Sequence, residues 1–249
     1  MIRTIGVVSA KGGVGKTVTT LNLSAALMEM GQSVIAVDAD VKMSGLALQL
    51  GMYHFPLTLE DVLNNNASLL EAMYIHSSGL RIIPASLYLE DVKISKLKSV
   101  LNHPELDNNI VMIDTPPGLE KNSITAMKSC QEILVVTTPE LPSVADIMKT
   151  IRIANESGIK VLGIIINMYR KSREQITAGE IEFACKTPVI GVVPFDKKLH
   201  KSIFKSIPHV LMNPYSPASI EFIKIASWLI EEEYKHPHIL KRLLWRFKR

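Results

Sequence analysis

The stretch Lys11-Gly12-Gly13-Val14-Gly15-Lys16-Thr17 decides the fold expected for this chain. It stands between a β-branched run over residues 2–9, predicted as a buried strand, and an apolar-faced stretch over residues 15–30, predicted as a helix. Glycines let backbone N–H groups curl around phosphate oxygens, and a helix N-terminus adds unsatisfied donors there. The pattern therefore predicts a P-loop that binds ATP, with Lys16 on the β- and γ-phosphates and Thr17 on Mg²⁺. The nucleotide-binding residues expected here are Lys11, Gly12, Gly13, Val14, Gly15, Lys16, Thr17 and Val18.

Further strands and helices are predicted to alternate along the 249 residues. Such alternation indicates an α/β fold, with a doubly wound and mostly parallel sheet flanked by helices in one ATPase domain over residues 1–234. A basic amphipathic tail is predicted over residues 235–249. The other predicted strands are 33–38, 80–84, 109–114, 132–137, 160–167 and 189–194, and the other predicted helices are 44–50, 59–75, 91–101, 121–129, 143–157, 175–184 and 217–234.

Carboxylates follow two of the predicted strands, at the edge of the sheet where ligands bind in such folds. Asp38 and Asp40 end the strand over 33–38, and Asp114 ends the strand over 109–114. Two carboxylates one residue apart can address a metal ion and a water. Either group could instead serve as a helix N-cap. Beside a phosphate-binding loop, we interpret Asp38 and Asp114, together with Thr17, as candidate Mg²⁺ ligands.

The loop departs from the usual P-loop pattern, because Ala10 and Lys11 stand where a glycine normally begins it. In this respect the chain resembles the deviant Walker A ATPases of the MinD/ParA group, over nearly its whole length. The resemblance implies that Lys11 crosses an ATP-dependent homodimer interface to the partner's nucleotide. It also implies that Asp38 and Asp40 form a first switch, with Asp40 orienting the attacking water, so that Lys11, Lys16 and Asp40 are the catalytic candidates. Asp114 would then hold Mg²⁺ indirectly.

The same resemblance implies an adenine site and marks two departures. Asn167 is similar to the family's adenine-reading asparagine, and Pro194 to Asp196 resemble the loop that lines the base. Val18 stands where a second threonine is common, so the α-phosphate would keep only a backbone contact. Ser44-Gly45 stands where the first switch often carries asparagine. A glycine there predicts slow or differently controlled hydrolysis.

The C-terminal tail carries the basic charge of the chain. Residues 235–249 hold six Lys and Arg side chains and no acid, whereas the remainder has 22 basic against 24 acidic residues. As a helix, the segment from residue 239 presents an apolar stripe opposite a basic face, with Trp245 on the polar side. This pattern favours a helix lying in a membrane interface and resembles the membrane-targeting helix of MinD proteins, although a helix docked on its own core is the alternative. The residues expected to meet the membrane are Ile239, Leu240, Lys241, Arg242, Leu243, Leu244, Arg246 and Phe247.

The function expected from these patterns is a slow, dimerising Mg-ATP switch that attaches reversibly to an anionic membrane. Such a protein would be cytoplasmic and peripheral at the cytoplasmic membrane, and would plausibly regulate division-site placement. An unidentified protein partner is expected to bind near the helix that contains Ser143 and Asp146. A ParA-like partition ATPase that binds DNA is the first alternative, disfavoured by the nearly neutral body. A metal-insertion factor is the second, and the lack of paired cysteines disfavours it, since Cys130 and Cys185 are far apart.

Overall fold

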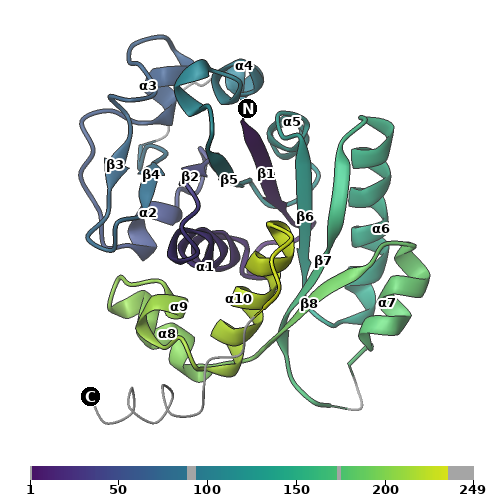
Figure 1. Ribbon diagram of the computed structural model, residues 1–249. Helices are drawn as coiled ribbons and strands as arrows, with labels where there is room; N and C mark the ends of the chain where they lie inside the picture. The colour runs from purple at the N-terminus through teal and green to yellow at the C-terminus, as the bar shows by residue number, and fades with distance from the viewer. Residues whose placement is uncertain (1, 89–93, 173–174, 235–249) are drawn as a thin grey trace, which may run out of the picture.

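The computed structural model describes residues 2–88, 94–172 and 175–234, and within these it contains one eight-stranded sheet (Figure 1). The strand order is β3-β4-β2-β5-β1-β6-β7-β8, and every pairing is parallel except that of β3 with β4. This agrees with the predicted doubly wound, mostly parallel sheet. The strands are β1 Arg3–Val8, β2 Val34–Asp38, β3 Tyr74–Ile75, β4 Arg81–Ile83, β5 Ile110–Asp114, β6 Glu132–Thr137, β7 Lys160–Tyr169 and β8 Val189–Pro194.

Helices cover both faces of the sheet, which is why its central strands are apolar on both sides. One face is covered by α1, which packs against α9 and α10, and by α2. The other face is covered by α3 to α7. The helices are α1 Lys16–Glu29, α2 Leu46–Gln49, α3 Leu59–Leu63, α4 Leu97–Leu101, α5 Lys121–Lys128, α6 Leu141–Glu156, α7 Ala178–Cys185, α8 Lys197–Phe204, α9 His209–Met212 and α10 Pro217–Leu229.

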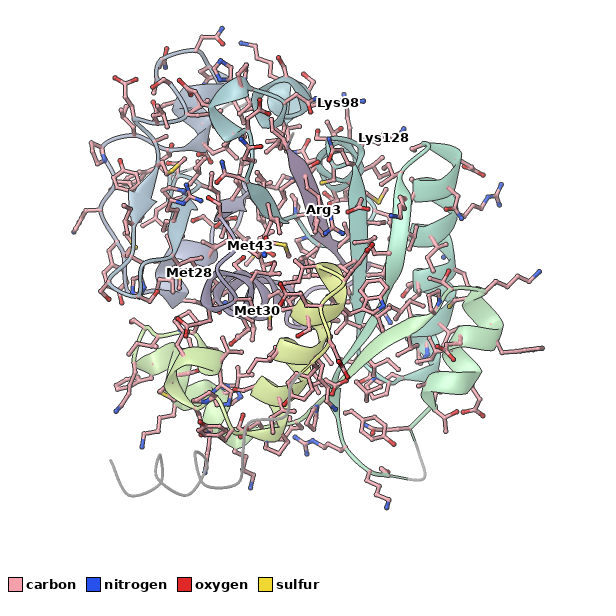
Figure 2. All side chains as sticks on the ribbon, viewed as in Figure 1. Arg3, Met28, Met30, Met43, Lys98 and Lys128 are labelled. Carbon is pink, nitrogen blue, oxygen red and sulfur yellow. The ribbon has the colours of Figure 1, made fainter. Side chains whose placement is uncertain are left out.

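The parallel register brings the carboxyl ends of the central strands to one edge. Asp38 and Asp114 are register partners on β2 and β5, and Val7 of the first strand pairs with Asp114 on its other side. At the opposite edge, Arg3, labelled in Figure 2, donates its Nε–H to Glu132 at 2.7 Å, and Lys160 pairs with the same carboxylate. The sheet therefore separates a structural ion-pair cluster from the edge that receives the loop of residues 11–17.

The structure corrects several predicted elements. The helix expected over 59–75 ends at Leu63, because Asn65 takes a left-handed φ of 61° and the chain then enters the antiparallel strand β3. The helix expected over 217–234 ends at Leu229, before Glu231 with φ 57°. Helices α8 and α9 were not predicted. The first residues of the helix expected over 91–101, and the whole predicted membrane tail, lie outside the described residues.

Among the residues that the structure describes, no helix is long and apolar enough to cross a bilayer.

Candidate functional site

The glycine-rich loop takes the backbone conformation that its sequence requires. Gly13 and Gly15 have φ of 78° and 91°, in the left-handed region that side chains disfavour. A Cβ at Gly15 would also lie 2.2 Å from the Asn167 side-chain nitrogen, so this position admits only glycine. Gly15 is the N-cap residue of α1, and the free backbone N–H groups of that helix end face the loop. The cradle fits a phosphate group, as the sequence predicted.

Lys16 supplies the positive charge of the site. Its side chain is buried, with 8% of the residue exposed, and loss of hydration lowers the pKa of its ammonium. The nearby carboxylates of Asp114, Asp40 and Asp38 act in the opposite direction and favour the charged form. A buried cation surrounded by three acids is poised to exchange some of these partners for phosphate oxygens.

Asp114 connects the loop to the centre of the sheet. Its Oδ2 accepts a hydrogen bond from the Thr17 hydroxyl at 2.5 Å, and its Oδ1 accepts one from Thr20 at 3.4 Å. Burial raises the pKa of Asp114 to about 6, although these hydroxyls and the Lys16 charge act to lower it. Thr17 therefore lies where it can ligate a divalent cation while Asp114 orients its hydroxyl. The indirect metal role that the resemblance implies for Asp114 stays a prediction.

Asp38 holds the following loop in shape. It is completely buried, and its carboxylate accepts backbone hydrogen bonds from Asp40, Gly45 and Leu46 at 3.0 to 3.1 Å. Burial, followed by the charge of Asp114, raises its pKa well above the ordinary value. These bonds give Asp38 an anchoring role in addition to the metal role predicted from sequence. Asp40 is 9% exposed, and its Oδ1 accepts from Met43 N at 3.1 Å. Its charge acts on Lys16, so it lies near the phosphate loop.

Within the described part of the chain, no group of three His, Cys, Asp or Glu side chains could by itself hold a metal ion. Mg²⁺ commonly takes only one or two protein oxygens and completes its octahedron with water and substrate phosphates. The donor set of Thr17 with Asp114 beside a phosphate cradle fits that mode of binding.

A largely apolar pocket that is open to solvent lies beside the loop, between the end of β7 and helix α8. Asn167 and the segment Pro194–Asp196 line it, as the resemblance implied for an adenine site. The Asn167 amide donates to Val14 O at 2.8 Å and accepts from Met168 N at 2.9 Å, so it also fastens β7 to the phosphate loop. The remaining lining residues are Gly15, Val18, Met168, Leu199, His200 and Ile203.

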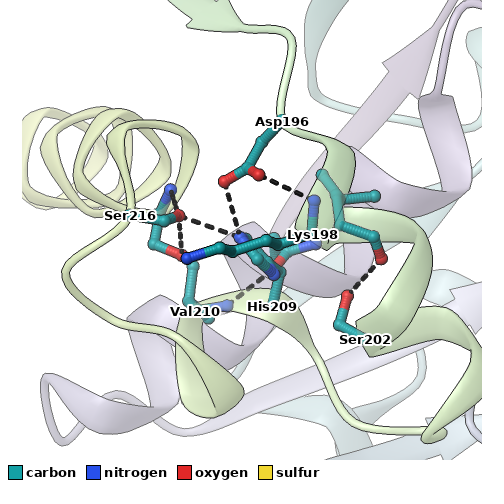
Figure 3. A network of polar contacts seen from close by, with 9 residues as sticks. Asp196, Lys198, Ser202, His209, Val210 and Ser216 are labelled. Carbon is teal, nitrogen blue, oxygen red and sulfur yellow. Dashed lines mark hydrogen bonds and ion pairs between the residues drawn. The ribbon is translucent and has the colours of Figure 1, made fainter. Parts of the chain in front are cut away.

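A buried polar network supports the wall of this cavity (Figure 3). Asp196 is the N-cap residue of α8, because its carboxylate accepts from Lys198 N at 2.8 Å. Its other oxygen lies 3.2 Å from Nε2 of His209, and the same nitrogen lies 2.8 Å from the Ser216 hydroxyl. Burial lowers the pKa of His209, which favours a neutral ring. Ser216 in turn caps α10, so a single imidazole ties the base loop to two helices.

His209 and Ser216 were missed by the sequence analysis, and no sequence signal marks a histidine that becomes completely buried. Helix α8 did leave a signal, because Leu199 and Ile203 are spaced four residues apart and follow the capping residue Asp196. A pattern of this length is easily overlooked beside stronger ones.

Lys11 points away from the phosphate cradle. Its Nζ lies 3.2 Å from the Asp146 carboxylate on α6, and 44% of its side chain is exposed. The Lys11 backbone carbonyl accepts from the Ser9 hydroxyl at 2.7 Å, which fixes the start of the loop. The structure thus brings Lys11 to the helix proposed for a protein partner, whereas the resemblance placed it on a second subunit's nucleotide.

Comparison with known proteins finds relatives along almost the whole chain. The family model described as "ParA: NUBPL iron-transfer P-loop NTPase" matches residues 1–230. An uncharacterized ATP-binding protein of Methanocaldococcus jannaschii is 36% identical over 234 residues, which cover 93% of this chain and 89% of that protein. The septum site-determining protein MinD of Thermotoga maritima is 32% identical over 233 residues, covering 89% and 86%. A solved structure of MinD with Mg-ADP from Pyrococcus horikoshii is 35% identical with a TM-score of 0.87, covering 92% and 96%.

Proposed function

This chain belongs to the ParA family of P-loop NTPases, and from that premise we propose that it is a MinD-like switch. In this proposal it binds Mg-ATP, dimerises while ATP is present, attaches reversibly to an anionic membrane surface and is released after slow hydrolysis. The observation that carries the ATPase part is the buried Lys16 at a loop whose Gly15 admits no side chain. The relative from Thermotoga maritima supports a role in positioning the division site.

In this proposal each residue of the site has a different role in ATP hydrolysis. Lys16 and the backbone N–H groups of the loop neutralise the phosphate charge that develops during transfer to water. Asp40, close to Lys16 and held by Met43 N, orients the attacking water. Asp114 keeps the Thr17 hydroxyl directed at the cation site. Mg²⁺, when bound, supplies charge neutralisation on the phosphate oxygens.

The position of Lys11 suggests how dimerisation is controlled. Lys11 is paired with Asp146 of its own chain, so this ion pair competes with a contact from Lys11 to a second subunit. Both side chains are partly exposed, so the pair is weak, and the charge of a partner's nucleotide can displace it. We expect Lys11→Ala to bind ATP but remain monomeric in light scattering, and Asp146→Ala to dimerise at a lower ATP concentration. If Lys11→Ala dimerises normally, Lys11 is not an intermolecular group.

The membrane part of the proposal is supported by the sequence of the tail, residues 235–249, which lies outside the described residues. A single short amphipathic helix binds lipid weakly, but a dimer presents two. The second then binds at a high effective concentration, which can raise avidity by roughly 10²–10⁴-fold over a single site. This coupling turns ATP-dependent dimerisation into ATP-dependent attachment of a cytoplasmic protein to the membrane.

The decisive experiment is sedimentation with anionic liposomes in the presence of ATP or ADP. The intact chain should bind with ATP and be released with ADP, a chain truncated after Lys235 should not bind, and Leu243→Glu should bind poorly. The truncated protein should still hydrolyse ATP, which is the control for folding. Equal binding with both nucleotides, or full binding by the truncated protein, contradicts the proposal.

Two other functions are less well supported. A DNA-partition ATPase predicts ATP-dependent retardation of duplex DNA, to be measured by gel shift in the same nucleotide conditions. The matching family model names iron transfer, but Cys130 lies between α5 and β6 and Cys185 ends α7. Both cysteines are buried, and burial raises the pKa of each thiol. Neither cysteine is placed to hand over a metal.

A further inference from the structure

Helix α8 presents a basic face with an exposed aromatic ring. Lys197, Lys201 and Lys205 follow one another at intervals of four residues, and Phe204 lies three residues after Lys201. Residues three and four apart share one side of a helix. The Phe204 residue is 90% exposed. We call Lys197, Lys198, Lys201, Phe204 and Lys205 the α8 basic face.

The opposite side of α8 packs against the domain, and this packing keeps the basic face directed toward solvent. Ser202 is 2% exposed and donates to Leu199 O, and Leu199 and Ile203 line the base cavity. The helix therefore cannot rotate to bury Phe204 without opening that cavity. The orientation of the basic face is a property of the folded domain.

The lysines of this face have no carboxylate ion-pair partner among the residues that the structure describes. The sequence contains no Asp or Glu from Lys197 to Ile220. An unopposed cluster of positive charge attracts an anionic surface. The same positive charge disfavours docking of this face on the α8 basic face of a second copy, because like charges repel.

The apolar members of the region decide which anionic surface fits. Phe204 is followed by Ile207, which is 38% exposed. An aromatic and an aliphatic side chain among lysines match the interface of a bilayer, where the rings enter the acyl boundary and the ammonium groups meet the head groups. Nucleic acid could bind the lysines through its phosphates, but it offers Ile207 no apolar environment comparable to the acyl boundary.

After α10 the described part of the chain turns back along that helix. Glu231, with φ 57°, reverses the direction of the chain, and the Tyr234 ring lies 5.9 Å from Nζ of Lys224, back along α10. The start of that helix, Ser216, is joined to the cap of α8 through His209. The last described residue thus leads back toward the end of α10 that adjoins α8.

We propose that the α8 basic face is a second lipid contact, carried by the folded domain, which binds an anionic membrane beside the tail and sets the orientation of the domain there. This inference rests on the proposed membrane attachment and adds to it. Two lipid contacts at different places restrict the orientation of the dimer on the membrane, whereas attachment by the tail alone leaves the domain free to rotate. Helix α8 then stands between the base cavity and the lipid, since its opposite side forms a wall of that cavity.

The test compares the charge-reversed and ring-deleted variant K201E/F204S with the intact protein. Binding is measured with ATP on vesicles of phosphatidylcholine containing increasing phosphatidylglycerol. We expect about tenfold weaker vesicle binding and a shallower dependence on the anionic lipid content. The reason is that each basic residue near an anionic bilayer adds to the electrostatic attraction between protein and lipid. Affinity for fluorescent ATP should be unchanged, since neither Lys201 nor Phe204 lines the cavity.

The matched control is K98E/K128E. These two exposed lysines lie on α4 and α5, at the end of the molecule opposite to α8 (Figure 2), and their reversal changes the net charge more than K201E/F204S does. The control should bind vesicles like the intact protein.

Four results contradict the inference. Vesicle binding by K201E/F204S equal to that of the intact protein removes the α8 contact and leaves the proposed function standing. An equal loss in K98E/K128E means that net charge alone is responsible. Selective loss of duplex DNA binding by K201E/F204S assigns the face to nucleic acid. If the intact protein fails to bind anionic vesicles at all, the proposed membrane function and this inference fall together.

Discussion

The phosphate half of the site holds buried charges with displaced pKa values, whereas the base half is largely apolar and is held together by hydrogen bonds within the chain. Around the phosphate loop, Lys16, Asp38 and Asp114 are buried together and their pKa values are displaced by loss of hydration. Around the base cavity, the side chains of Asn167 and Asp196 form hydrogen bonds with neighbouring backbone groups and with His209. We therefore expect a bound nucleotide to stabilise the phosphate half more than the base half. The contrast predicts that substitutions in the two halves will behave differently.

The largest effect is expected for Lys16→Ala. Removing the buried cation leaves three acids facing the phosphates without compensation, so ATP binding and hydrolysis should both be lost, with kcat/KM lower by about 10³-fold or more. Isothermal titration and phosphate release measure the two losses separately. Undiminished ATPase activity would remove the P-loop assignment and the contrast with it.

Asp40→Ala should affect chemistry without affecting binding. Loss of a group that orients the attacking water should reduce kcat by about 10²–10⁴-fold, while Mg-ATP affinity and dimerisation persist. Phosphate release under single-turnover conditions is the measurement, and light scattering with ATP is the control. Normal turnover would show that Asp40 serves only to hold Met43 N.

Asp114→Asn should stabilise the protein in the absence of nucleotide. The folded pKa of about 6 exceeds the ordinary 3.8, so the folded state binds this proton more tightly than the unfolded state does. The stability of the intact protein should therefore fall as pH rises from about 4 to about 6, and the variant should be more stable at pH 7 by about 1–3 kcal/mol. Urea denaturation at pH 4.5 and 7 tests this. A less stable variant at pH 7 would contradict a displaced pKa of Asp114 in the phosphate half.

His209→Phe should weaken the base half alone. The change keeps a ring but removes the hydrogen bonds to Asp196 and Ser216, so the base loop loses its anchor. We expect about fivefold weaker ATP binding, the equivalent of one hydrogen bond, and unchanged binding of inorganic tripolyphosphate. Asp196→Asn, which weakens the same contact from the other side, should reproduce the result. Equal losses for both ligands would show that the two halves are coupled.

The smallest effect is expected for Gly45→Asn, which restores the asparagine common in the first switch. Gly45 has φ −130°, and an added Cβ would meet its nearest neighbour, Met43 O, at 3.7 Å, an ordinary contact. Turnover should be unchanged or faster, by about twofold, as for a substitution without strain. A large loss of activity would show that the backbone there needs glycine after all.

Much of the phosphate half could be predicted from the sequence because its residues lie in one contiguous loop and at strand ends. The run from Lys11 to Thr17 carries its own conformation through Gly13 and Gly15, and the parallel register brings Asp38 and Asp114 together. The base half could be predicted only by resemblance. Its supports join residues such as Asn167 to Val14 and Asn22 to Val210, which are 153 and 188 positions apart.

The sequence by itself determined most of the strands and the longer helices, the phosphate loop and the acids beside it, because these follow from local periodicity and backbone chemistry. It did not reveal the short strand β3 or the helices α8 and α9. Only the tertiary structure decided that Lys11 is held by Asp146, that His209 is buried beneath the base loop, and that α8 turns its lysines outward. These depend on which distant elements pack together. Packing is governed by the summed burial of many side chains, and no short stretch of sequence contains that information.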